Sequence, residues 1–154
     1  MKTWIKVFAV TVFVAAPAMM LGPVIWPPAD VGPEPTAGQF PFFLFLALME
    51  SIVLGLGISF LAFGLPVVRR ISADSKLRAW AMYLSIGWLM VSWWPHDNLH
   101  MHTGIDLQKL LYIEYGFHVT LMVCAIVLAY CFLSLVNRGS LRTGTSEPLT
   151  YARR

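Results

Sequence analysis

The chain is organised as four long apolar segments separated by shorter polar ones. The apolar segments cover about residues 4–25, 42–68, 77–94 and 110–136. Each approaches or exceeds the ~20 residues that an α-helix needs to cross the hydrocarbon core of a bilayer. We therefore expect an all-α integral membrane protein in which residues 1–136 form a four-transmembrane-helix bundle. The polar segment 137–154 is expected to be a mobile cytoplasmic tail.

Composition supports a membrane protein and excludes a soluble one. The 154 residues are 58% hydrophobic and only 12% charged, with a mean hydropathy of +0.69. A soluble domain of this length cannot bury that much apolar surface in its own core. The formal net charge of +3 is carried by residues near the ends of the apolar segments, so it does not indicate a nucleic-acid partner. The lipid bilayer is the partner that the composition predicts.

The distribution of basic residues predicts the orientation. Lysine and arginine gather near both termini and in the second polar connector, at Lys2, Lys6, Arg69, Arg70, Lys76, Arg78, Arg138, Arg142, Arg153 and Arg154. The first and third connectors carry mainly acidic residues, prolines and histidines. Because positive charge stays on the cytoplasmic side, both termini are expected to be cytoplasmic in a plasma (bacterial inner) membrane. The first and third connectors then face the extracytoplasmic side, and the proline-rich first connector can cover the outer end as a lid.

The N-terminal segment has features of both a membrane span and a cleavable signal peptide. Lys2 and Lys6 precede an apolar stretch, and Ala16-Pro17-Ala18 offers small residues near its end. We expect an uncleaved span, because the apolar character continues to Ile25 and because a proline is awkward beside a cleavage site.

Four histidines are the strongest indication of function. All of them lie between positions 96 and 118, around the junction of the third and fourth apolar segments: His96, His100, His102 and His118. Asp97, Asp106 and Glu114 lie among them. Imidazole and carboxylate together are the ligands that borderline transition metals select, so we expect a site for copper, iron or zinc.

The third connector permits two arrangements of its histidines. If Pro95 lies in the first turn of a helix, His96 and His100 project from one face as an i, i+4 pair. If the segment is extended, His100 and His102 share a side instead. In either arrangement Asp97 and Asp106 are candidates to accept the second ring N–H of a metal-binding histidine.

Ionisable residues within the apolar segments complete the candidate site. Glu114 and His118 are four residues apart, hence on one helical face, and Glu50 is expected at a similar depth on the second segment. The predicted metal ligands are therefore His96, His100, His118, Glu114, Asp97, His102 and Glu50. A purely structural hydrogen-bonded pair of Glu114 and His118 is the alternative interpretation.

Three functions are compatible with this pattern. The first is metal handling or membrane redox chemistry at a metal site on the outer face. The second is a non-catalytic accessory role in a larger membrane complex or a homo-oligomer. The third is electron transfer by a b-type haem held between His118 and a histidine of the third segment. The sequence contains no catalytic loop motif that decides whether the protein is an enzyme.

Overall fold

A computed structural model describes residues 2–30, 35–72 and 75–143, and these residues are almost entirely helical. The helices are α1 (Thr3–Ile25), α2 (Phe40–Phe63), α3 (Leu65–Ile71), α4 (Lys76–Val91), α5 (Trp93–Thr103), α6 (Leu107–Ile113), the π-helical turn η1 (Glu114–Val119) and α7 (Thr120–Thr143). No strand occurs among the described residues. The expected all-α fold is confirmed.

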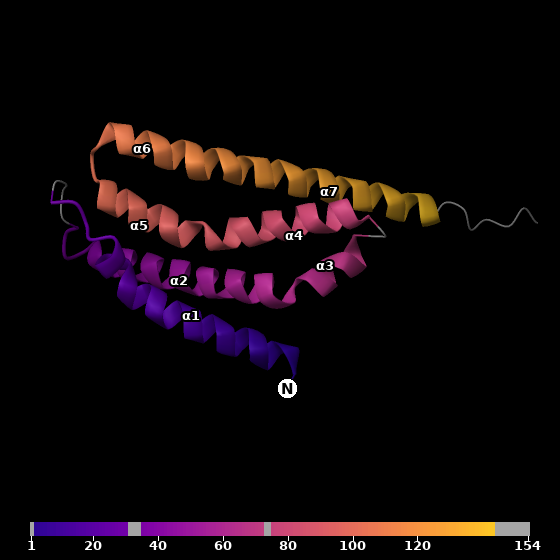
Figure 1. The fold of residues 1–154 in the computed structure, drawn as a ribbon, viewed down its shortest axis with the longest axis horizontal. Coiled ribbons are helices and arrows are strands. Elements are labelled where there is room, and N and C mark those ends of the chain that lie inside the picture. Colours follow the sequence, from indigo (N-terminus) through magenta and orange to yellow (C-terminus); the bar gives the residue numbers. More distant parts are fainter. Residues whose placement is uncertain (1, 31–34, 73–74, 144–154) are drawn as a thin grey trace, which may run out of the picture.

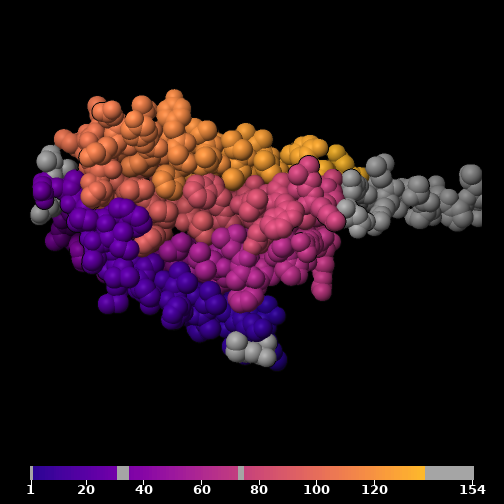
Figure 2. Space-filling model, viewed as in Figure 1, coloured from indigo at the N-terminus to yellow at the C-terminus, as the bar shows by residue number. Residues whose placement is uncertain are grey.

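The helices form roughly parallel rods that lie in a row in chain order (Figure 1). The rods are α1, then α2 with α3, then α4 with α5, and finally α6 with η1 and α7. The end of α1, the start of α2 and the α5–α6 connection lie at one end, and the end of α3, the start of α4 and the end of α7 lie at the other (Figure 1). In the space-filling view α1 and α6–α7 form the two long edges of the molecule (Figure 2).

Three helices in the described part of the chain are long and apolar enough to cross a membrane. They are α1, α2 and the continuous helix 107–137 that α6, η1 and α7 form together. The expected third span differs, because the helix ends at Val91 and a new one begins at Trp93 after Ser92. The expected second span also divides, because α2 ends at Phe63 before the Gly64-Leu65-Pro66 sequence that opens α3. Residues 137–143 of the expected tail belong to α7, and 144–154 lie outside the described residues.

Glycine and hydroxyl residues bring α1 and α2 close together. A Cβ atom added at Gly55 would lie 2.4 Å from the backbone oxygen of Thr11, so only glycine permits this approach. Beside it, the fully buried Ser59 donates a hydrogen bond of 3.1 Å to the carbonyl of Val7. This contact satisfies the buried Ser59 hydroxyl between the two helices and holds them in register.

Glycine residues and a hydroxyl group also bring α2 and α4 close together. A Cβ atom at Gly57 would lie 2.7 Å from Cγ1 of Val91, and one at Gly87 would lie 2.4 Å from Cδ2 of Leu61. Tyr83 donates a hydrogen bond to the carbonyl of Leu61. The close helix contact therefore lies on the glycine-containing face of α2, on the same side as the buried Glu50.

The described part of the first connector folds back onto α5. The backbone N–H of Ala29 donates to the carbonyl of Met101 at 3.0 Å, and the ring of His102 bonds the carbonyl of Pro27 at 2.8 Å. The Trp26 and Trp94 rings meet edge to face, with centroids 5.1 Å apart. These contacts fix the end of the molecule at which the histidines lie.

Candidate metal centre

The first two histidines of the centre come from α5. This helix begins at Trp93, so Pro95 lies in its first turn, where a missing backbone N–H costs no intrahelical hydrogen bond. His96 and His100 consequently share a face, and their Nε2 atoms are 3.1 Å apart. Of the two predicted arrangements of the connector, the helical one is correct.

Gly104 ends α5 and turns the chain toward the third histidine. Its φ of 59° lies in a region that residues with a Cβ rarely adopt. Asp106 then begins α6 by accepting hydrogen bonds from the backbone N–H groups of Gln108 and Lys109. The tight turn places the following helix directly against α5.

The π-helical turn η1 supplies the third imidazole. Within Glu114–Val119 the backbone winds more widely than an α-helix, and such turns are frequent at functional sites. The His118 ring here faces the His96 ring, with centroids 4.8 Å apart, and His118 Nδ1 contacts a carboxylate oxygen of Glu114. Glu114 and His118 thus do form the pair that their spacing predicts, but both side chains are nearly half exposed.

Three imidazoles converge on one point. His96, His100 and His118 each offer a ring nitrogen, and these three atoms all lie within 4.8 Å of one another. Tetrahedral coordination with metal–nitrogen distances of about 2.0–2.1 Å places ligand nitrogens about 3.3 Å apart. The three side chains therefore need only small rotations to hold one transition metal ion.

Two carboxylates orient the rings. Asp97 Oδ1 lies 2.6 Å from Nδ1 of His96, and Glu114 is at Nδ1 of His118. When each Nδ1 carries the ring proton, it donates to the carboxylate and leaves the Nε2 lone pair free for a metal. The second oxygen of Glu114 lies 3.8 Å from Nε2 of His100, close enough to supply an oxygen ligand after a small shift.

The centre has one apolar wall. His96 is 6% exposed and packs against the rings of Trp93 and Phe117, with centroids 5.8 and 5.4 Å away.

Burial lowers the pKa of His100, and its neighbour His96 lowers that pKa further. A lowered pKa keeps the imidazole neutral near pH 7, which is the form that binds metal.

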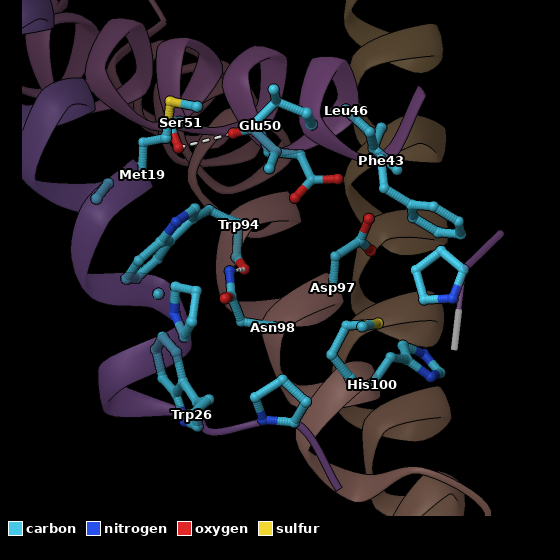
Figure 3. A pocket seen from close by; sticks show the side chains of 18 of the residues that line it. Met19, Trp26, Phe43, Leu46, Glu50, Ser51, Trp94, Asp97, Asn98 and His100 are labelled. Carbon is cyan, nitrogen blue, oxygen red and sulfur yellow. Dashed lines mark hydrogen bonds between the residues drawn. The ribbon is translucent and has the colours of Figure 1, made fainter. Parts of the chain in front are cut away.

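Three of the predicted site residues lie elsewhere or act differently. His102 points away from the cluster and bonds Pro27. Glu50 is buried on α2 and lines a separate cavity, where it faces Asp97 (Figure 3). Asp106, predicted to accept from a histidine ring, instead caps α6 and pairs with Lys109 at 3.3 Å.

Two features of the centre were not predicted. The first is the π-helical turn, for which Gly116 is a weak sequence signal because glycine tolerates irregular backbone. The second is the aromatic wall of Trp93 and Phe117, whose positions next to the histidines in sequence offered a hint. Comparisons of the chain with protein-family models, curated proteins and solved structures find no match.

Proposed function

We propose that this chain is a four-span protein of the plasma membrane that binds one transition metal ion at its extracytoplasmic end. Convergence of the His96, His100 and His118 nitrogens within 4.8 Å is the observation that carries the proposal. Glu114 is the fourth ligand. Three nitrogens and one oxygen suit copper(II), iron(II) or zinc, and the ion serves metal handling or membrane redox chemistry.

The proposed orientation has both termini in the cytoplasm. The positive-inside rule supports it, since Arg69, Arg70, Lys76 and Arg78 flank the α3–α4 connection at the end opposite the histidines (Figure 1). In this proposal the third crossing covers about residues 77–94, which are α4 and the first residues of α5, and His96 and His100 lie beyond its outer end. Thiol labelling tests the orientation: in a variant with Cys124 and Cys131 replaced by serine, Ile105→Cys reacts with an impermeant reagent in intact cells and Leu77→Cys reacts only after permeabilisation.

Metal content tests the site directly. The protein is extracted gently, without chelators or a histidine tag, and analysed for metals together with its absorption spectrum. Near-stoichiometric metal in the wild type, lost in His100→Ala and His118→Ala, is expected. His102→Ala is the matched control, because His102 lies in the same helix but outside the cluster, and it keeps the metal. Undiminished metal in both cluster variants, or none in the wild type, would overturn the proposal.

The geometry favours a metal ion over b-type haem. Two histidines that ligate one haem approach the iron from opposite faces of a wide macrocycle. The rings of His96 and His118 are instead in contact, with His100 beside them, and leave no space for a porphyrin between them. A Soret band in the spectrum of the purified protein would reverse this preference.

An accessory role in a larger membrane complex is the second candidate. The observation in its favour is that Glu114 and His118 remain nearly half exposed on the outer rod of the row, a polar surface that a neighbouring subunit would cover. Co-purification of the untagged neighbour in mild detergent, without bound metal, is the result that this role predicts. A monodisperse, metal-loaded protein would count against it.

A further inference from the structure

A second site lies beside the metal centre, in a cavity of about 500 Å³ between α1, α2 and α5. This volume is in the range of small-molecule sites in proteins. Most of its lining is apolar, and aromatic rings of Trp26, Phe43 and Trp94 contribute to it (Figure 3). Phe43 and Leu44 are about half exposed, so the cavity borders the surface that faces lipid.

One buried polar atom in this cavity has no hydrogen-bond partner. Glu50 is 8% exposed, and its Oε1 atom makes no hydrogen bond. The carboxyl groups of Glu50 and Asp97 point toward one another across the cavity (Figure 3). A buried acceptor without a partner is costly, so a ligand that donates a hydrogen bond to it gains free energy on binding.

These features define the ligand chemically. It enters from lipid and fills an apolar, aromatic-lined space, so it is a largely apolar molecule. It donates a hydrogen bond to facing carboxyl groups while remaining neutral, because an ammonium group would lose its hydration in these surroundings. We propose that this cavity binds the head group of a membrane-soluble hydroquinone, with one phenolic O–H donating to Glu50 and the tail extending into the bilayer.

The proposed site is connected to the metal centre but does not depend on a bound ion. Asp97 lines the cavity and also contacts Nδ1 of His96, and His100 lines the cavity from the same helix. Glu50 and the apolar residues of α1 and α2 line the cavity whether or not a metal ion is bound. Binding of the intact hydroquinone involves no electron transfer, so it can be measured on metal-free protein.

The test is anaerobic binding of a tritiated decyl-hydroquinone to metal-free protein in nanodiscs. Saturable binding is expected, weakened about tenfold in Glu50→Leu because a hydrogen bond to a charged or buried acceptor is lost. The dimethyl ether of the probe, which has no O–H, is expected to compete poorly. His118→Ala is the matched control and binds the probe like the wild type, because His118 does not line the cavity.

A second variant tests the cavity independently, in case Glu50→Leu does not fold. Ala47 is an exposed residue that lines the cavity, so Ala47→Phe narrows the cavity without disturbing a buried contact and is expected to abolish saturable binding. Equal binding of the probe and its dimethyl ether, unsaturable partitioning, or displacement by decylamine alone would overturn the proposal. Glu50→Leu is expected to keep its metal and His118→Ala to lose it, so failure of this inference and failure of the metal site are distinguishable.

Discussion

Nδ1 of His96 lies 2.6 Å from Oδ1 of Asp97, the next residue in the chain. Consecutive residues on a helix point about 100° apart, so this contact brings together two side chains that helical spacing alone separates. It fixes the His96 ring with Nε2 directed at His100, while Asp97 itself borders the cavity that contains Glu50. Asp97 is thus a positioning residue for the metal centre.

Replacing Asp97 by asparagine is expected to weaken metal binding about 10–100-fold, because the carboxylate that orients His96 loses its charge. Competition with a chelator of known affinity measures the change. Asp106→Asn is the matched control: it makes the same chemical change, and asparagine caps a helix as well as aspartate does. Equal loss of affinity in the two variants would show that Asp97 has no specific role.

Much of the fold follows from apolar length and periodicity. The first, second and fourth apolar segments contain α1, α2 and helix 107–137, the three helices that are long and apolar enough to cross a membrane. The break at Ser92 is signalled by Pro95, which has no backbone N–H and whose ring clashes with the carbonyl of Val91 four residues earlier, whereas hydropathy alone misses the break because the apolar character continues through Trp93 and Trp94. Hydropathy measures composition and does not report the backbone hydrogen bonds that define a helix end.

The sequence predicted contacts between residues one turn apart on the same helix. It did not predict contacts that depend on how one helix is rotated relative to another. The i, i+4 pairs His96–His100 and Glu114–His118 follow from helical spacing and are both present. Glu50 was expected at the depth of His118, yet depth says nothing about which face of α2 it occupies. Asp106 directly precedes α6, and its side chain accepts hydrogen bonds from free backbone N–H groups in the first turn of that helix. A search of the sequence for metal ligands alone does not consider this capping role.

The π-helical turn gives a test of how His118 reaches the cluster. Deleting Gly116 removes the extra residue that the wide turn accommodates, so η1 closes to an α-helix, and His118 is then three residues from Glu114 and turned away from its present direction. His118 then leaves the cluster, so metal binding is expected to disappear while circular dichroism still reports a helical protein. Gly116→Ala is the control that keeps the length, and nothing lies within 4 Å of the added Cβ. Wild-type metal content in the deletion variant would contradict this role for η1.

The contact between Gly55 and Thr11 predicts a position where a single methyl group destabilises the protein. In Gly55→Ala the Cβ atom meets backbone rather than a movable side chain, so α1 and α2 must separate. The free energy of unfolding is expected to fall by about 1–3 kcal/mol, as is usual for overpacking. Unfolding in mixed micelles measures it, with Gly38→Ala, which meets no atom within 4 Å, as the control. A larger loss in the control than in Gly55→Ala would refute the steric explanation.

Acid is expected to destabilise the metal-free protein partly through His100. Because burial and His96 lower the His100 pKa, the folded protein keeps this ring neutral where the unfolded chain, with a pKa of about 6.5, takes up a proton. Stability is therefore retained above about pH 6.5 and declines as the pH falls below it. The Tm in detergent should drop between about pH 7.5 and about pH 5.5, and drop less in His100→Gln than in the wild type or in His102→Gln. Equal drops in all three proteins would mean that His100 does not couple folding to pH.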